Sequence, residues 1–122
     1  MASAKVELLK ERIQDVTDPD DIFLEIMELF DDLEMIPEVG KYYTFIYQPK
    51  TPHIRYDEFP LIACVDLFPW GFRGVNFHWE DYRNYTWMEV AGQLRVISDA
   101  DIDGMKNIPY AKFLLNREKS SV

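Results

Sequence analysis

The residues of this chain best suited to catalysis surround His78, which is closely followed by Glu80 and Asp81. A histidine oriented by a carboxylate is a common general base. Residues two and three positions apart on an extended strand point in mixed directions, however, so this spacing does not imply a proton relay. We therefore predict no catalytic residue and expect His78 to be a surface or hydrogen-bonded histidine.

Aspartates alternate from Asp99 to Asp103 and are followed by Gly104, which resembles the opening of a calcium-binding loop. Such a loop needs a glutamate at its twelfth position, where this chain has Tyr110. Ser98 directly precedes the run and is a good N-cap residue. We therefore predict a short capped helix here and no metal site.

The single cysteine, Cys64, lies between Ala63 and Val65 in an apolar run. No basic neighbour favours its thiolate, so we expect a core residue rather than a nucleophile. His53 lies in a proline-flanked loop and is expected to be exposed. The sequence contains no motif that binds phosphate or a cofactor, so we predict no cofactor.

Acidic residues are concentrated in the first third of the 122-residue chain. Residues 1–39 carry 12 acids and 3 bases, a net charge of −9, whereas residues 40–122 carry 10 of each. We expect this change to divide the chain into an acidic N-terminal helical extension, residues 1–39, and a domain of residues 40–122. No signal-peptide pattern or membrane-spanning apolar stretch is present, which predicts a soluble protein in the cytoplasm.

Two amphipathic helices are expected in the acidic extension. Apolar residues spaced by three and four predict the first over residues 4–16. Asp18 suits the N-cap and Pro19 the first position of the second helix, which we expect to end at Glu34 or Met35. We expect the acidic outer face of this helix to be solvated, the alternative being a docking face for a basic partner.

Short strands with tight turns are expected after Gly40. The predicted strands are residues 42–47, 61–68, 72–79, 94–96 and 110–115, with a long loop at 48–60, a polar connection at 80–84, an ambiguous segment at 85–90 and a helical turn at 99–104. This order predicts an α+β protein: two N-terminal helices followed by a small SH3-like five-stranded antiparallel β-barrel.

Alternation along these strands predicts which side chains are buried. Tyr43, Phe45 and Tyr47 share one face of the first strand, and the apolar run 61–68 indicates burial on nearly both faces. In the strand 72–79, Val75, Phe77 and Trp79 are expected to alternate against Arg73, Asn76 and His78. Gly74 suggests a bulge or a close backbone contact.

Aromatic residues are dense in the middle of the chain, where 14 of the 18 lie between Tyr42 and Trp87. A small barrel cannot bury all of them, and exposed aromatics beside arginines are typical of protein interfaces. Stacking of single-stranded bases is an alternative, but the absence of net positive charge weakens it. The predicted partner-binding residues are Trp70, Phe72, Arg73, Arg55, Tyr82, Arg83 and Tyr85.

Three segments, residues 43–51, 56–61 and 70–78, resemble short proteins encoded by bacteriophages with contractile tails, especially those of marine cyanobacteria. The shared pattern is aromatic-x-Pro-Lys, then Tyr-Asp-x-x-Pro-Leu, then Gly-Phe-x-Gly-x-Asn-x-His. The similarity covers about residues 42–80 and leaves the helices out. Arg55 and Trp79 depart from it, since relatives often carry tyrosine at both positions. The resemblance implies a phage origin and makes the chain a candidate virion component, with no catalytic residue to carry over.

These observations predict a non-enzymatic phage structural or adaptor module, a minor component of the tail, baseplate or neck. Its expected partners are other phage structural subunits, with homo-oligomerisation possible, no membrane association and little affinity for nucleic acid. It is expected in the host cytoplasm during infection and in the virion. The alternative is an early regulatory protein that binds a host protein or single-stranded nucleic acid.

Overall fold

The computed structural model describes residues 4–50, 54–90 and 93–116. His53, whose exposure was predicted, lies outside the described residues. The elements in chain order are α1 (Ala4–Arg12), α2 (Pro19–Leu29), β1 (Leu33–Glu34), β2 (Tyr42–Thr44), β3 (Ile54–Asp57), β4 (Leu61–Phe68), β5 (Gly71–Asn76), β6 (Asp81–Thr86), β7 (Leu94–Ile97), α3 (Asp99–Met105) and β8 (Phe113–Asn116).

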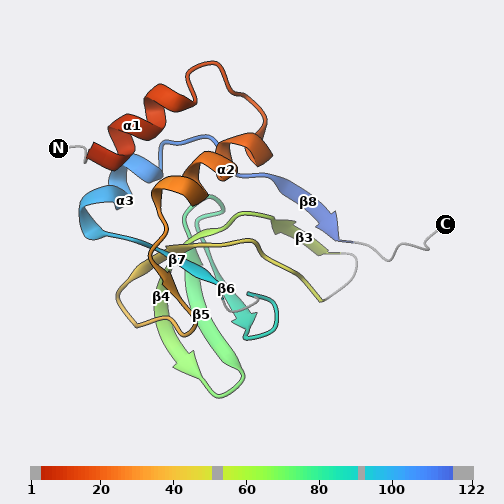
Figure 1. Ribbon diagram of the computed structural model, residues 1–122. Coiled ribbons are helices and arrows are strands. Elements are labelled where there is room, and N and C mark those ends of the chain that lie inside the picture. Colours follow the sequence, from red (N-terminus) through yellow and green to blue (C-terminus); the bar gives the residue numbers. More distant parts are fainter. Residues whose placement is uncertain (1–3, 51–53, 91–92, 117–122) are drawn as a thin grey trace.

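The strands form two antiparallel sheets. The larger has six strands in the order β1-β7-β2-β4-β5-β6, and the smaller pairs β3 with β8. The three helices lie together over one end of the larger sheet, and the β4–β5 hairpin projects from the opposite end (Figure 1). The α+β class and the antiparallel sheet are confirmed. The predicted closed five-stranded barrel is not confirmed, because the described parts of β1 and β6 are edge strands that do not pair with each other.

Helix α1 ends at Arg12, four residues before the predicted end. The chain leaves the helix in a tighter turn, in which the Val16 N–H donates to the Ile13 carbonyl at 3.0 Å. The predicted apolar face is nevertheless correct, because Val6, Leu9 and Ile13 are all buried.

Helix α2 begins as predicted but ends early. The Asp18 carboxylate accepts a hydrogen bond from the Asp20 N–H at 3.0 Å, and Pro19 is the first helical residue. The prediction that the helix continues to Glu34 or Met35 is wrong. The Arg95 guanidinium donates to the carbonyl oxygens of Met27 and Phe30, at 2.9 and 3.0 Å, and so satisfies the end of the helix. The chain then forms β1, which pairs with β7.

The segment 48–60, predicted to be an unpaired loop, contains β3. Its residues pair with β8 from Ile54↔Asn116 to Asp57↔Phe113. Proline disfavours a paired strand because it has no N–H to donate. The prolines at positions 49, 52 and 60, however, all lie outside Ile54–Asp57 and interrupt none of its hydrogen bonds. The last strand correspondingly starts at Phe113, later than predicted.

The β4–β5 hairpin is confirmed, but β5 ends at Asn76 and the predicted polar connection belongs largely to β6. The Asn76 carboxamide oxygen accepts hydrogen bonds from the N–H groups of His78 and Trp79, at 2.8 and 3.1 Å, and so turns the chain. Glu80 completes the turn with a φ of 59°. The predicted alternation along this strand is also wrong, since Asn76 is buried and Val75 lies on the outer face.

The irregularity expected at Gly74 lies on the neighbouring strand. The register of β4 against β5 shifts between Cys64 and Asp66, directly opposite Gly74. Strand β4 is buried only as far as Cys64, and its second half is largely exposed. The expected burial on both faces is therefore wrong beyond the bulge, where the hairpin extends past β2.

The remaining elements largely match their predictions. Strand β7 (Leu94–Ile97) and helix α3 (Asp99–Met105) are present, with Ser98 as the N-cap of the helix. The Ser98 hydroxyl donates to the Asp101 carboxylate at 2.8 Å instead of to a backbone group. The ambiguous segment 85–90 divides between the end of β6 and a turn.

Two groups of buried side chains form the core. One joins the helices to the sheet and includes Val6, Phe23, Leu61, Ile97 and Tyr110. The other fills the concave side of the sheet with the predicted set of Tyr43, Phe45 and Tyr47, together with Ile62, Cys64, Phe72, Tyr85, Val90 and Leu94. The acidic extension therefore shares a core with residues 40–122, and it also supplies β1 to the larger sheet.

Candidate protein-binding surface

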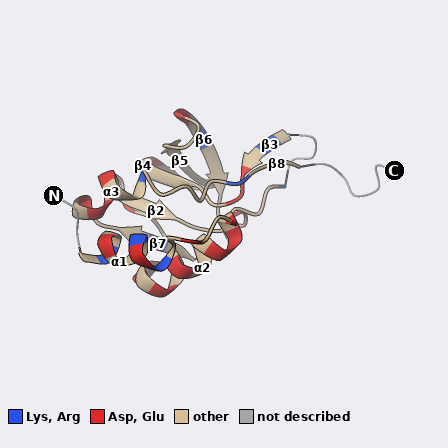
Figure 2. Cartoon of the chain, turned by 90° about the horizontal axis from the view of Figure 1, so that it is seen from above, with Lys and Arg blue, Asp and Glu red and all other residues tan. Residues whose placement is uncertain are grey.

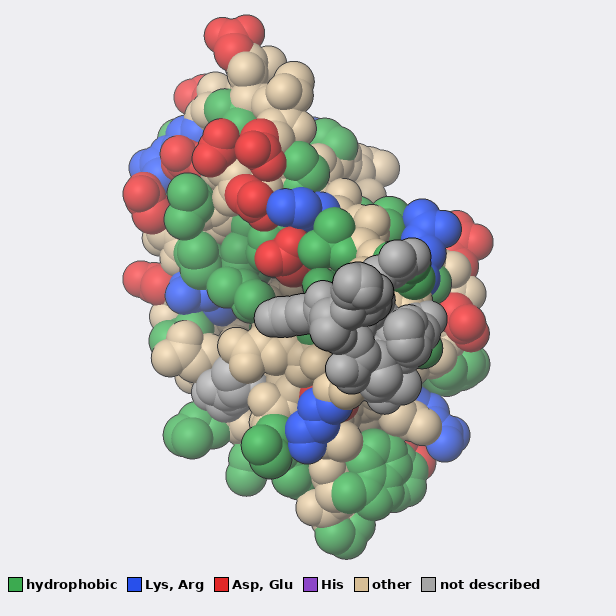
Figure 3. Space-filling view, turned by 90° about the vertical axis from the view of Figure 1, so that its right-hand side faces the viewer, with side chains coloured by type: hydrophobic (Ala, Val, Ile, Leu, Met, Phe, Trp, Pro, Cys, Tyr) green, Lys and Arg blue, Asp and Glu red, His purple; other side chains and the backbone are tan. Residues whose placement is uncertain are grey.

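Acidic and apolar side chains occupy opposite ends of the molecule. Asp and Glu gather on the helical layer in Figure 2, and hydrophobic side chains gather at the bottom of Figure 3, where the β4–β5 hairpin projects. Part of the helical charge is paired: Arg12 contacts Glu25 and Glu28, at 3.2 and 2.9 Å. The end bearing the hairpin has the character of an interface, because a large exposed apolar patch is rare on a monomer without a partner.

A groove of about 500 Å³ lies at this hairpin end, and its walls are apolar. It is lined by Met35, Ile36, Phe68, Pro69 and Trp87. These come from the turn after β1, the tip of the hairpin and the residue after β6, so the curl of the sheet brings its two edges together here. We call these five residues, together with the neighbouring exposed Leu67, Trp70 and Met88, the apolar end.

The exposure of the apolar end is too high for side chains that merely cover a core. Met35 is 74% exposed, Met88 71% and Ile36 66%, although all three are large and apolar. Trp70 is 45% exposed at the tip of the hairpin. Large apolar side chains of this kind are the usual anchors of protein interfaces.

The aromatic residues of the apolar end are fixed by one another. Phe68 and Trp70 stack with ring centroids 4.9 Å apart, and the indole N–H of Trp87 donates to the Pro69 carbonyl at 2.8 Å. The Arg73 guanidinium lies 5.8 Å from the Phe68 ring and donates to the Asn84 side chain at 3.2 Å. A surface already ordered in this way loses little conformational entropy on binding.

The predicted partner-binding residues divide between surface and core. Trp70, Arg73, Arg55 and Tyr82 are exposed, as expected. Phe72 and Tyr85 are 0% and 2% exposed, so their prediction as surface residues is wrong. They are cross-strand partners on the concave face, where their rings lie 5.4 Å apart. Alternation along β5 and β6 decides that Phe72 and Tyr85 are buried. Predicting it from the sequence required the correct strand register.

Arg55 and Arg83 flank Trp79 at the opposite end of β6. The Arg83 guanidinium carbon lies 4.8 Å from the Trp79 ring centroid and that of Arg55 5.4 Å. Phe113 packs edge-on against Trp79 at 5.1 Å, and Arg83 donates to the Arg55 carbonyl at 3.4 Å. Cation–π contacts of this kind fasten the β3–β8 sheet to the larger sheet. Both predicted arginines therefore have a structural use.

A buried His–Asp pair lies beneath this contact. The Nδ1 atom of His78 is 2.7 Å from Oδ2 of Asp57, and their side chains are 9% and 0% exposed. The other Asp57 oxygen accepts the Phe59 N–H at 3.0 Å, and the imidazole packs edge-on against Tyr110 at 5.0 Å. A carboxylate that orients a histidine is a catalytic arrangement, but both side chains are almost completely buried here, and the imidazole Nε2 has no hydrogen-bond partner among the described residues. The expected hydrogen-bonded histidine is confirmed, and its partner was missed because Asp57 lies 21 residues away.

Glu89 is a second buried carboxylate that the sequence did not indicate. Its two oxygens accept hydrogen bonds from the Tyr47 hydroxyl at 3.0 Å, the Lys50 N–H at 3.3 Å, and the Thr86 N–H and hydroxyl at 2.8 and 2.9 Å. It holds the chain after β2 against the turn after β6. Four donors satisfy this charge, so it has a structural explanation.

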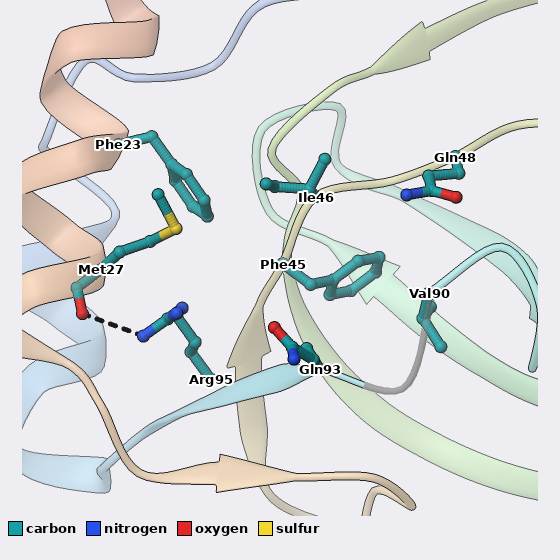
Figure 4. A pocket seen from close by; sticks show the side chains of 8 residues that line it. All are labelled: Phe23, Met27, Phe45, Ile46, Gln48, Val90, Gln93 and Arg95. Atoms are coloured by element: carbon teal, nitrogen blue, oxygen red, sulfur yellow. Dashed lines mark hydrogen bonds between the residues drawn. The ribbon is translucent and has the colours of Figure 1, made fainter.

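A smaller cavity of about 120 Å³ lies between α2 and the sheet, where the chain after β2 diverges from β7 (Figure 4). Phe23 and Met27 project into it from the helix, and Phe45 faces them from the sheet. Arg95, the one charged side chain among the described residues that line it, is the group that caps α2. The cavity is therefore a packing defect between layers, remote from the apolar end.

The thiol and the buried phenols of the core are held in their neutral forms. Burial raises the pKa of the Cys64 thiol, which keeps it protonated, and the expected core position of this residue is confirmed. Burial likewise raises the pKa values of Tyr85 and Tyr110. Among the residues that the structure describes, no group of three or more His, Cys, Asp or Glu is placed to hold a metal ion.

Comparisons with protein families, with curated proteins and with solved structures found no match to this chain. Within the described ranges, none of the helices has the length and apolar character needed to cross a membrane.

Proposed function

We propose that this protein is a non-catalytic binding module that assembles with other protein subunits through its apolar end. The single observation that carries this proposal is the groove between Met35, Ile36 and Trp87, with Met35 and Ile36 mostly exposed on its rim. Burying these side chains against a partner would release them from water, at about 25 cal/mol per Å² of apolar surface. The enclosed His78–Asp57 pair supports an interaction role over an enzymatic one.

The resemblance of residues 42–80 to proteins of contractile-tailed phages supplies the context for this proposal. A minor component of a tail, baseplate or neck contacts several other subunits, which suits a small module with one strongly apolar end. Such a protein is made in the host cytoplasm and retained in the particle. Mass spectrometry of purified virions tests this context, and absence of the protein from particles of a strongly expressing phage contradicts it.

Site-specific photo-crosslinking tests the binding surface itself. A photoreactive phenylalanine analogue replaces Met88, which is 71% exposed at the apolar end, in the full chain expressed in its native cell. The matched control carries the same analogue at Leu24, which is 54% exposed on α2. We expect covalent protein adducts from position 88 and few from position 24. Equal labelling from both positions, or none from position 88, contradicts the proposed surface.

A further inference from the structure

The apolar end contains both a projection and a matching recess. Trp70 stands at the tip of the β4–β5 hairpin with 45% of its surface exposed. The groove lined by Met35, Ile36 and Trp87 begins beside it, since Pro69, the residue before Trp70, forms part of the groove wall. A surface with a projection beside a recess can be complementary to itself about a two-fold axis.

Charged side chains of both signs lie near the apolar end, which suits contact between two copies. Arg73 and Asp66 face each other in register on β5 and β4 and are both exposed. Neither takes part in any ion pair between described residues. Where two hairpins meet, each copy would therefore offer an unpaired cation and an unpaired anion to the other.

The distribution of net charge favours the same arrangement. The whole net charge of −9 equals that of residues 1–39, so the helical layer carries the excess of acid. Figure 3 shows the acidic side chains at the end of the molecule opposite the apolar end. Two copies joined through their apolar ends would hold their acidic helices far apart, which minimises repulsion between like charges.

We propose that the occupant of the apolar end is a second copy of this chain, with Trp70 of each copy seated in the groove of the other. This inference rests on the proposed function, because it names the partner of the same surface. The dimer is isologous and closed, with the acidic helical layers facing outward at both ends. Trp70 is its central anchor, and Met35 and Trp87 form the walls of the receiving groove.

Analytical ultracentrifugation of the full chain tests the dimer. We expect a species of twice the 14.5 kDa chain mass, and weakening of self-association by at least about tenfold in Trp70→Ala. The control Leu24→Ala, which removes an apolar side chain of α2 that is 54% exposed, should leave the dimer unchanged. Circular dichroism confirms that each variant is folded. A monomer at every concentration up to about 100 μM overturns the inference, as does a dimer unaffected by Trp70→Ala.

Cysteine trapping tests the geometry. Leu67→Cys and Met35→Cys variants, which both keep Trp70, are mixed under mild oxidation, and we expect a disulfide joining one of each, because the hairpin tip of one copy would lie against the groove of the other. A mixture of Leu67→Cys with Leu24→Cys is the control and should remain uncrosslinked. Equal crosslinking in both mixtures overturns the arrangement.

The outcomes separate this inference from the proposed function. If the protein is monomeric but photo-crosslinking from position 88 yields adducts with other proteins, the second copy is wrong and the binding surface is retained. If the protein is monomeric and no adduct forms, both are wrong.

Discussion

The imidazole of His78 and the carboxylate of Asp57 meet at 2.7 Å in the interior, although one comes from a turn of the larger sheet and the other from the smaller sheet. Asp57 ends β3, and His78 lies in the turn between β5 and β6. The pair therefore joins the small sheet to the large one at the site where Trp79 and the two arginines join them on the surface. Removing one member leaves the other as a buried polar group without its partner. This costs more free energy than replacing both members with apolar residues.

Asp57→Asn should destabilise the protein by about 3 kcal/mol, because the His78 imidazole loses its carboxylate partner within the core. His78→Gln should cost a similar amount, and the double variant should cost less than the sum of the two. Urea unfolding of all three variants measures this coupling. Asp81→Asn is the control, since its side chain is exposed and accepts, from the part of the chain that the structure describes, only the adjacent Tyr82 N–H. Additive effects of the two substitutions would show that the pair contributes nothing of its own.

Trp79→Ala should loosen β3 and β8 without unfolding the larger sheet. Trp79 contacts Arg55, Arg83 and Phe113, so its loss removes the indole ring on which the surface contact between the sheets is built. We expect faster hydrogen exchange at the backbone amides of β3 and unchanged exchange in β4. Tyr82→Ala, which removes a side chain that is 64% exposed, is the matched control. Uniformly faster exchange throughout both sheets would contradict a local role.

Features decided by neighbours along the chain could be predicted from the sequence. Asp18 and Pro19 mark the start of α2, Ser98 marks the start of α3, and the apolar run of β4 marks a strand. In each case the capping group or the pattern lies within a few residues. Local side-chain and backbone preferences were therefore sufficient.

Features decided by distant residues could not be predicted in this way. The end of α2 depends on Arg95, more than 60 residues later, whose contacts no local pattern reveals. The pairing of β3 with β8 and the contact of Asp57 with His78 also cross long stretches of chain. The candidate site shows the same limit: Trp70 could be placed at an exposed turn, whereas the burial of Phe72 depended on the register of the sheet.

Gly71→Ala should cost about 3 kcal/mol or more, because β6 approaches the backbone of β5 too closely for a side chain. A Cβ atom at this position would lie 2.8 Å from the Thr86 Cα and closer still to the Tyr85 carbonyl oxygen. Gly74→Ala is the milder substitution for comparison, since its Cβ atom would lie 3.1 Å from the Ile62 side chain, which can shift slightly. Chemical unfolding of both variants should show the larger loss at Gly71. Equal losses would show that the close approach of β6 does not control this site.

Alkaline pH should unfold the protein through its buried tyrosines. Burial raises the pKa values of Tyr85 and Tyr110 above the ordinary value of 10.0. Each phenol is therefore neutral in the folded state at a pH where the unfolded chain ionises. The stabilisation from the raised pKa values is fully present below about pH 10 and is lost as pH rises toward the folded-state values. The free energy of unfolding should fall by up to about 1.4 kcal/mol per pH unit for each such tyrosine.

Urea unfolding between about pH 9 and pH 12 measures this slope, and tyrosinate absorbance should rise together with the loss of structure. Tyr110→Phe removes one buried phenol, whose hydroxyl lies 3.1 Å from that of Thr44. This variant should be less stable at neutral pH, because it loses that hydrogen bond, but should lose stability less steeply with pH. Tyr82→Phe, at an exposed position, should leave the slope unchanged. Full tyrosinate absorbance from a protein that is still folded would contradict the role of burial.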